Sequence, residues 1–289
     1  MKRATILIFI LSTMIQIVIA QDDDAIFLDT GISKIWETKN LFITSESVLF
    51  DKKRDVLYVS NFDQPNVNNP DVFQHISKLS LSGDIIDLKW VDSLKNPLGI
   101  TIFDDKLFVT ERKRIAEIDL ETGKVVRRYP LPESLFLNDI AIDDQGVIYS
   151  TDSRKSVIWR IKEGSAEEWL SGDEVKTPNV MYIKGNELFF GSCGDQLLKC
   201  VDLRTKSIRH ITDFEPGFID GFRFDENGNY LVSLWKGKVY RITPGGEKTK
   251  IIDSSKQGIY SADFEYIADK KLLIIPNFFT NKVTAFRIE

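Results

Sequence analysis

The sequence is short of cysteine and histidine, with only Cys193, Cys200, His75 and His210 among its 289 residues. Zinc sites are built mainly from thiolates and imidazoles, so this shortage argues against a zinc centre. The two cysteines flank a turn at Gly194-Asp195, which would set Cys193 opposite residue 196 or 197 rather than opposite Cys200. We therefore expect no disulfide, even though an exported protein could oxidise the pair. We interpret both histidines as surface residues.

Long apolar runs are missing after the first twenty residues, and no later segment approaches the eighteen apolar residues of a membrane span. The chain starts with Lys2 and Arg3, followed by an apolar run that ends in the small-residue pattern Val18-Ile19-Ala20. This arrangement is typical of a secretory signal at residues 1–20, cleaved before Gln21. The alternative is a membrane anchor, but the run is short and a polar stretch follows it at once. The sequence thus predicts a periplasmic or secreted protein.

An excess of positive charge is also absent. The formal net charge is −5, and removal of Lys2 and Arg3 would make it −7. The other basic residues are scattered among acids, so we do not expect nucleic acid as a partner. The chain also lacks a G-x-S-x-G elbow, a phosphate-binding glycine loop and an H-E-x-x-H motif. These absences argue against a serine hydrolase of the usual pattern, a nucleotide-binding protein and a zinc protease.

What the sequence does contain is a repeat. An anchor residue is followed by alternating apolar positions, a polar turn and a second apolar strand that begins about ten residues on. The pattern recurs six times, with anchors at Glu46, Leu98, Asn138, Asn179, Asp220 and Ala262. The anchors are 52, 40, 41, 41 and 42 residues apart. An insertion around Gln64 to Gln74, rich in Asn and Pro, explains the long first spacing.

Each repeat unit has room for four short antiparallel strands, which is the content of a propeller blade. The sequence therefore predicts an all-β, six-bladed β-propeller that occupies residues 21–289 as a single domain. The sixth unit ends after three strands, at Glu289. The segment Ile32–Trp36 has strand character and no local partner, so we expect it to complete the last blade and close the ring. The alternative is an ordered arm outside the propeller.

The repeat also predicts a site. Equivalent positions on the innermost strands lie at the same height around one axis, so anchors from different blades converge there. Four of the six anchors carry oxygen in an otherwise apolar context: Glu46, Asn138, Asn179 and Asp220. Two facing carboxylates would repel each other and would be costly to bury, and a bound cation removes both problems.

Two carboxylates and two amide carbonyls suit a hard divalent cation. We expect Ca²⁺, because it accepts more and looser oxygen ligands than Mg²⁺, and we keep Mg²⁺ and Mn²⁺ as alternatives. The other interpretation of the same four residues is a hydrogen-bonded polar plug that joins the blades without metal.

Three segments carry a resemblance to a known family: Glu46–Asp51, Asn138–Asp143 and Ile219–Asp225. They resemble the blade-opening motifs of the senescence marker protein/gluconolactonase family and, more distantly, of paraoxonase-type propellers. The likeness spans nearly the whole chain after residue 20. It implies a six-bladed propeller with a divalent metal in its channel and, for many members, lactone hydrolysis.

By similarity, Glu46, Asn179 and Asp220 match the metal ligands of this family. Asn138 matches an asparagine beside the metal that can contact either the metal or the substrate. Ser47 departs from the glycine that the family usually has. Phe136 stands where some sugar-lactone members carry a substrate-binding arginine, which argues against a polyhydroxylated sugar as the substrate.

Three aromatic residues precede an anchor by two positions: Phe136, Phe218 and Tyr260. They could surround the channel mouth and bind an apolar ligand, or they could only pack between blades. Hydrolysis would use a water activated by the cation, with Asp220 as the general base, Asn138 beside it and Asp139 as the reserve candidate for the base. The rival hypothesis is a propeller without catalysis that binds a ligand or protein and holds a structural metal.

Overall fold

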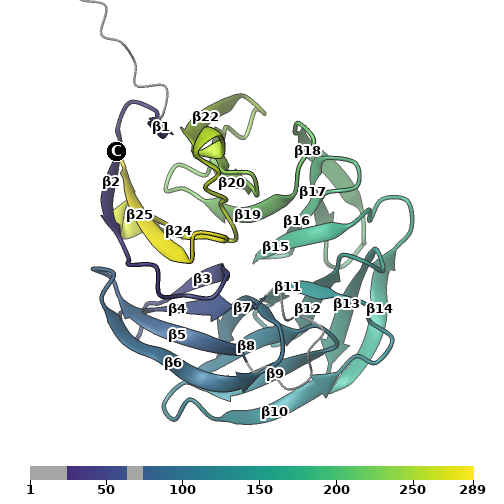
Figure 1. Ribbon diagram of the computed structural model, residues 1–289. Helices are drawn as coiled ribbons and strands as arrows, with labels where there is room; N and C mark the ends of the chain where they lie inside the picture. Colours follow the sequence, from purple (N-terminus) through teal and green to yellow (C-terminus); the bar gives the residue numbers. More distant parts are fainter. Residues whose placement is uncertain (1–24, 64–73) are drawn as a thin grey trace, which may run out of the picture.

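The computed structural model describes residues 25–63 and 74–289. Within these ranges the chain forms six antiparallel sheets arranged in a ring (Figure 1), which is the all-β, six-bladed propeller that the repeat predicts. The only helical elements in the described ranges are two single 3-10 turns, η2 (Ser255–Gln257) and η3 (Ala268–Lys270). No helix of this part of the chain is long and apolar enough to cross a membrane.

The first three sheets each contain four strands in chain order. The first consists of β3 (Ser45–Asp51), β4 (Val56–Asn61), β5 (Gln74–Ser80) and β6 (Ile85–Leu94). The second consists of β7 (Pro97–Phe103), β8 (Lys106–Glu111), β9 (Arg114–Asp119) and β10 (Val125–Pro130). The third consists of β11 (Leu137–Ile142), β12 (Ile148–Asp152), β13 (Val157–Lys162) and β14 (Ser165–Ser171).

The remaining sheets continue the pattern and include the first two described strands. The fourth consists of β15 (Pro178–Lys184), β16 (Glu187–Ser192), β17 (Leu197–Asp202) and β18 (Ile208–Asp213). The fifth consists of β19 (Ile219–Phe224), β20 (Tyr230–Leu234), β21 (Lys238–Ile242), β22 (Lys248–Asp253) and β1 (Phe27–Leu28). The sixth consists of β23 (Glu265–Ile267), β24 (Leu272–Asn277), β25 (Lys282–Ile288) and β2 (Ile32–Glu37).

Two sequence predictions fall outside what the structure describes. The expected signal at residues 1–20 lies before the first described residue. The expected insertion at residues 64–74 also lies outside the described ranges, apart from Gln74, which begins β5.

The first and last described strands meet in the fifth and sixth sheets. Strand β2 pairs antiparallel with β25, from Ile32 opposite Ile288 to Glu37 opposite Thr284, and so is the fourth strand of the last sheet. Figure 1 shows the purple β2 along the yellow β25, beside the C-terminus. The short strand β1 pairs with β22, which the sequence did not suggest. The first described residues therefore join two neighbouring blades.

The sixth inner strand is shorter than the pattern predicts, because β23 begins at Glu265 rather than near Ala262. Before it, Asp263 forms an isolated parallel bridge with Ser47 of the first sheet. The Asp263 amide donates to the Glu46 carbonyl at 3.0 Å, and the Val48 amide donates to the Asp263 carbonyl at 3.1 Å. These hydrogen bonds hold the segment before β23 against β3, so they connect the last blade to the first.

Apolar side chains fill the spaces between neighbouring sheets. The fourth and fifth sheets illustrate this, because Phe189 of β16 stacks on Phe222 of β19 with ring centroids 5.2 Å apart. Tyr230 of β20 lies against the same two rings. Each of these side chains is more than nine-tenths buried, so the blade interfaces are packed cores.

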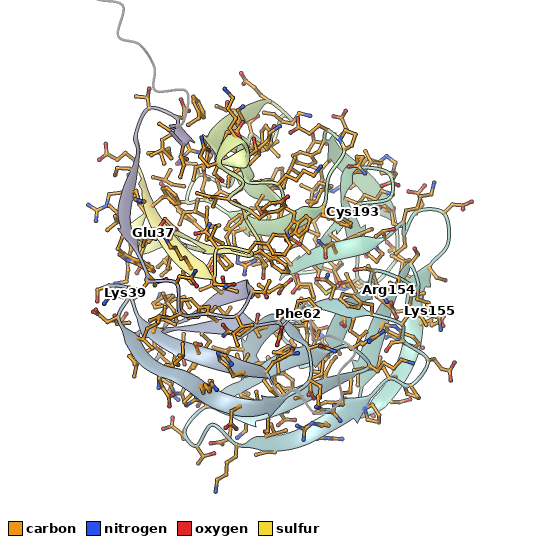
Figure 2. The ribbon with its side chains drawn as sticks, in the orientation of Figure 1. Glu37, Lys39, Phe62, Arg154, Lys155 and Cys193 are labelled. Carbon is orange, nitrogen blue, oxygen red and sulfur yellow. The ribbon has the colours of Figure 1, made fainter. Side chains whose placement is uncertain are left out.

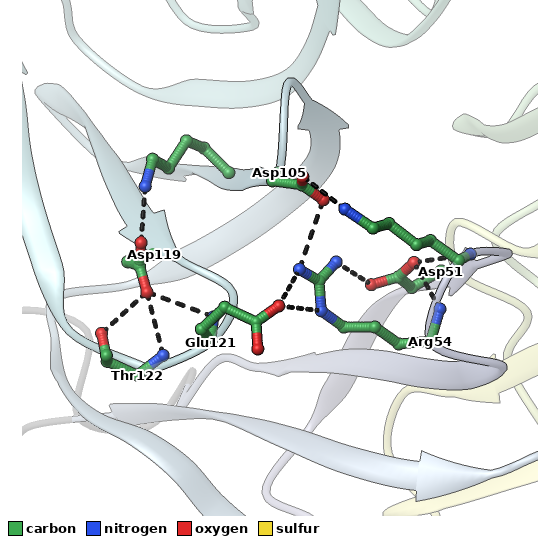
Figure 3. Close-up of polar contacts among 8 residues, drawn as sticks. Asp51, Arg54, Asp105, Asp119, Glu121 and Thr122 are labelled. Carbon is green, nitrogen blue, oxygen red and sulfur yellow. Dashed lines mark hydrogen bonds and ion pairs between the residues drawn. The ribbon is translucent and has the colours of Figure 1, made fainter.

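Ion pairs link the first two sheets at the ends of their inner strands away from the anchors. Arg54 lies in the turn after β3 and contacts Asp51, Asp105 of the β7–β8 turn and Glu121 of the β9–β10 turn (Figure 3). Lys53 pairs with Asp105 as well. Pairs of this kind at the surface stabilise a fold only modestly, so the apolar interfaces carry most of the stability.

The cysteines are both free, buried thiols. Ser192 pairs with Leu197 across the turn, so Cys200 lies further along β17, opposite Phe189, as the expected register requires. Burial raises the pKa of both thiols to about 12, which makes them inert at neutral pH.

The prediction that both histidines lie at the surface is wrong for His75. His75 is the second residue of β5 and is only 3% exposed, because the start of this strand is covered on both faces. Burial lowers its pKa to about 4, with a further contribution from Lys89, so the imidazole is neutral. His210 is exposed on β18, where its Nε2 lies 3.0 Å from Glu174 Oε2.

Deletion of residues 21–37 is expected to lower the melting temperature severely or to prevent folding. The deletion removes β1 and β2, so that β22 and β25 become open sheet edges. Thermal unfolding followed by circular dichroism measures this effect. A melting curve identical to that of the full chain would show that the ring does not depend on this closure.

A pair of point variants on β2 gives a milder version of the test. Trp36 packs on the first sheet and its Nε1 donates to the Leu81 carbonyl at 2.9 Å. We expect Trp36→Ala to lower the free energy of unfolding by about 2 kcal/mol. The neighbouring Ile35 is 45% exposed, so Ile35→Ala is the matched control. This control should change the free energy of unfolding by less than about 0.5 kcal/mol.

Candidate functional site

The anchors begin the inner strands at equivalent places. Each of the five anchors from Glu46 to Asp220 is the second residue of its strand. In each case the pairing register with the second strand shifts at the anchor, which marks a β-bulge. A bulge bends the strand and redirects a side chain that would otherwise follow the pleat. The repeated bulge therefore places the anchor side chains at the start of the channel.

One cavity of about 330 Å³ lies at this end of the channel. Its lining includes Glu46, Asn138, Asn179 and Asp220, so the structure brings the four oxygen-bearing anchors together. Leu98 lines the cavity too, as the apolar anchor of the second blade.

The polar side chains of the cavity are connected across blades. Asn179 Nδ2 donates to Asp220 Oδ1 at 2.5 Å and to the Ile219 carbonyl at 3.1 Å. Beside Asn138, Gly99 leaves the room that the third blade needs, since a Cβ there would lie 2.3 Å from Asp139 Oδ1. The two hydrogen bonds that Asn179 Nδ2 donates fix the orientation of the amide, because its nitrogen is bonded within the protein.

Two oxygen atoms of the cluster have no partner. Glu46 Oε2 and Asn179 Oδ1 are buried and accept no hydrogen bond within the residues that the structure describes. A buried acceptor without a donor costs free energy, and in a native protein it usually points to an unseen water or ion. A cation would satisfy both atoms at once.

The donor set fits a hard cation with oxygen ligands. No group of three or more His, Cys, Asp and Glu side chains in residues 25–63 and 74–289 is arranged to hold a metal ion. A cation at this site would therefore depend on Asn138 and Asn179 as well as on the carboxylates of Glu46 and Asp220. Calcium is the common ion that accepts such a mixture of carboxylate and amide oxygens.

Ionisation of both carboxylates of the cavity, Glu46 and Asp220, is unfavourable. Burial raises the pKa of Glu46 well above its usual value, and the nearby charge of Asp220 raises it further. Burial also raises the pKa of Asp220 to about 7, although the hydrogen bond from Asn179 opposes this shift. A divalent cation would reverse both effects, because an opposite charge at contact favours the ionised form.

A second cavity, of about 280 Å³, lies further along the inner strands. Its lining contains the carboxylates of Asp139, Asp263 and Glu265 and the buried guanidinium of Arg223. Arg223 contacts Glu265 at 3.2 Å and Asp263 at 3.4 Å. Asp139 belongs to this cavity and not to the first, and its oxygens accept the amides of Ile140 and Met181.

Ser47 has a role in this second cluster. Its hydroxyl donates to Asp263 Oδ2 at 2.6 Å, and both residues are buried. The serine therefore helps to hold the Asp263 carboxylate in place, which a glycine at this position could not do.

Aromatic side chains form the outer wall of the first cavity. Phe136 and Phe218 line it, as their spacing from the anchors suggested. Tyr260 does not line it, but packs behind the wall, with its ring centroid 4.7 Å from that of Trp235.

Sequence reasoning missed part of this wall. The missed lining residues include Phe62, Ser153, Trp235 and Phe278. Each of them directly follows the second strand of its blade, namely β4, β12, β20 or β24. This position recurs in the repeat just as the anchor does, so the same alignment of the six units could have identified it. Figure 2 shows Phe62 near the middle of the ring.

The sequence comparison agrees with the geometry. The family model described as "SMP-30/Gluconolactonase/LRE-like region" matches residues 44–264. The chain belongs to this family. The matched range begins two residues before Glu46 and ends after Asp263, so it includes all six anchors. No curated protein sequence matches the chain significantly.

Solved structures share the fold of this family member at low sequence identity. A gluconolactonase from Xanthomonas campestris aligns with a TM-score of 0.69 and 14% identity, covering 89% of each chain. An inactive virginiamycin B lyase from Staphylococcus aureus, solved with quinupristin, aligns with a TM-score of 0.64 and 15% identity, covering 89% of this chain and 99% of the lyase. The WD40 propeller domain of Doa1 aligns with a TM-score of 0.61 and 14% identity, covering 84% of this chain and 78% of that domain. Such likenesses establish the propeller architecture and leave the chemistry open.

Removal of either carboxylate should abolish stoichiometric binding of a divalent cation. Each of Asp220→Ala and Glu46→Ala removes half of the negative charge that attracts the ion. Elemental analysis and calorimetric titration with Ca²⁺ measure the effect. If the unaltered protein binds no divalent ion, then the four anchors form a hydrogen-bonded plug instead.

Proposed function

We propose that this protein is an exported, metal-dependent hydrolase of lactones or related esters. The observation that carries the proposal is the pair of buried, unpartnered oxygens, Glu46 Oε2 and Asn179 Oδ1, in a ligand-sized cavity of a gluconolactonase-family propeller. Export is proposed from the sequence of residues 1–20 alone, which has the features of a secretory signal.

The cation site consists of Glu46, Asn138, Asn179 and Asp220, and Ca²⁺ is the ion that we propose. When bound, a divalent cation would supply Lewis-acid assistance to an ester carbonyl and to an attacking water. The protein contributes the charge of the two carboxylates and the fixed orientation of Asn179, which its bonds to Asp220 and Ile219 hold in place.

Asp220 is the general base in this proposal. Its Oδ1 accepts the hydrogen bond from Asn179, which leaves Oδ2 to accept a proton from water. Water adds to the carbonyl carbon, the ring C–O bond breaks, and the proton taken by Asp220 passes to the departing oxygen, so that a hydroxy acid is the product. Asn138 is half-buried in the same cavity and can hold the substrate carbonyl or the cation. Asp139 is less suited to the role, since it lies in the other cavity.

The aromatic wall favours an apolar substrate. Beyond the polar anchors, a ligand would mainly contact aromatic side chains, namely those of Phe62, Phe136, Phe218, Trp235 and Phe278. Such surfaces bind alkyl and aryl groups through burial of apolar area, and they offer few partners for the hydroxyl groups of a sugar.

Asp220→Asn should lower turnover by about 10²–10⁴-fold, because an amide cannot accept the proton. An asparagine oxygen can still contribute to cation binding, so activity and metal content should separate in this variant. Steady-state hydrolysis of a lactone, with metal content measured on the same sample, tests the assignment. Full activity of Asp220→Asn would exclude Asp220 as the base.

Two further variants serve as controls for Asp220→Asn. Glu46→Gln mainly weakens the attraction for the cation, so its activity should recover in part as Ca²⁺ is raised. Asp139→Asn alters a carboxylate of the other cavity and should keep most of the turnover. A larger loss in Asp139→Asn than in Asp220→Asn would reverse the assignment.

Alkyl-substituted lactones should be better substrates than sugar lactones of similar size. The physical reason is the burial of the alkyl group against the aromatic wall, worth about 0.8 kcal/mol for each buried methylene. Comparison of kcat/KM over a small lactone panel, with and without a chelator, measures the preference. Absence of activity on every lactone and ester would favour the rival function, a binding propeller with a structural metal.

A further inference from the structure

The cavity contains one positively charged side chain that the proposed mechanism does not use. Arg154 lies in the turn between β12 and β13 and lines the cavity beside Phe136. Its guanidinium lies over the Phe136 ring, with the central carbon 5.0 Å from the ring centroid. Figure 2 shows Arg154 and its neighbour Lys155 on the same side of the ring of blades.

The guanidinium of Arg154 is free to bind a ligand. It makes no hydrogen bond and no ion pair in the described part of the chain. Its only specific contact there is the stacking of the guanidinium on the Phe136 ring. Stacking uses the face of the guanidinium and leaves the N–H groups in its plane available, in a fork that matches a carboxylate.

The turn that carries Arg154 is held by the buried carboxylate of Asp152. Asp152 Oδ1 accepts the amides of Phe136 and Lys155, both at 3.0 Å, so one carboxylate holds the Phe136 loop and the turn that carries Arg154. The Ser153 amide also donates to the Phe136 carbonyl at 3.1 Å. These hydrogen bonds hold the backbone segments that carry Arg154 and Phe136 next to each other.

The charge of the cavity points to the kind of ligand. Its lining has three charged side chains, Glu46, Asp220 and Arg154. A divalent cation balances the two carboxylates, so Arg154 is then the one uncompensated charge in a cavity whose remaining wall is mostly aromatic. A positive charge at the edge of an apolar pocket selects a ligand with an anionic end and an apolar body.

We propose that the substrate is an apolar lactone or ester that carries a carboxylate at a distance from the bond to be cleaved, and that Arg154 binds this carboxylate. The inference rests on the proposed function for the position of the scissile bond, because the cation and Asp220 mark that end of the cavity. Arg154 acts in binding and specificity, and the hydrolytic step remains as described.

Two lactones with the same alkyl side chain, one ending in a carboxylate and the other in a primary amide, test the proposal. The full-length protein, saturated with Ca²⁺, should hydrolyse the carboxylate with about tenfold higher kcat/KM than the amide, mainly through KM. Arg154→Met keeps the apolar stem against Phe136 and removes the charge, so the ratio should fall to about one. Arg154→Lys should give an intermediate ratio, because it keeps the charge without the planar fork.

Lys155→Met is the matched control. It removes the same charge one residue along the chain, but Lys155 is paired with Glu168 and its ammonium lies over Trp159, outside the cavity. The preference for the carboxylate should survive in this variant. A ratio near one in the unaltered protein, or a preference that persists in Arg154→Met, would overturn the proposal; in the second case the carboxylate binds at the cation instead.

A binding measurement separates this inference from the proposed function. Calorimetric titration with phenylbutyrate and with phenylbutyramide, neither of which can be hydrolysed as an ester, compares an anionic with a neutral ligand. Tighter binding of phenylbutyrate that is lost in Arg154→Met supports the role of Arg154 even if no lactone is turned over. Equal binding of the two ligands, together with lactone hydrolysis, would refute the role of Arg154 and leave the hydrolase function intact.

Discussion

The site depends on the burial of two carboxylates, Glu46 and Asp220, in one cavity. Each is less than one-tenth exposed, and the charge of Asp220 makes ionisation of Glu46 less favourable. Such a pair is stable as an ionised site only if the protein holds a compensating charge there. Three features keep the two carboxylates close together despite this cost. The repeated bulge directs the anchors into the cavity, the amide of Asn179 fixes Asp220, and the closed ring keeps the six inner strands around one axis.

The channel separates two kinds of acidic cluster. Around Asp263 and Glu265 the protein supplies its own cation, Arg223, together with the hydroxyl of Ser47, so the charges are matched from within. Around Glu46 and Asp220 the described residues supply no contacting cation and leave the oxygens Glu46 Oε2 and Asn179 Oδ1 without donors. This contrast favours the cluster of Glu46 and Asp220 as the place in the channel for an ion, because the charges of the other cluster are already matched by Arg223.

Sequence periodicity was sufficient for the fold and for the four polar anchors, because both depend on one strand position that recurs along the chain. Periodicity was insufficient for features that depend on contacts between different repeat units. The burial of His75, the separation of Asp139 from Asp220 and the stacking of Arg154 on Phe136 depend on how neighbouring blades and turns face each other. The aromatic positions after the second strands, such as Trp235, do recur in the repeat, so closer comparison of its units would have revealed them.

The closure by β2 has a consequence for how the chain reaches its native state. Glu37 and Lys282 are in contact although 245 positions separate them in the sequence. Contacts between such distant residues form slowly, since a long stretch of chain must lose its freedom before they contribute. The fifth and sixth blades therefore remain unfinished until the first strands return to them, and during this interval their exposed edges can pair with other chains. The interaction that completes the ring is also the one that sets the interval in which the nascent protein is most open to aggregation.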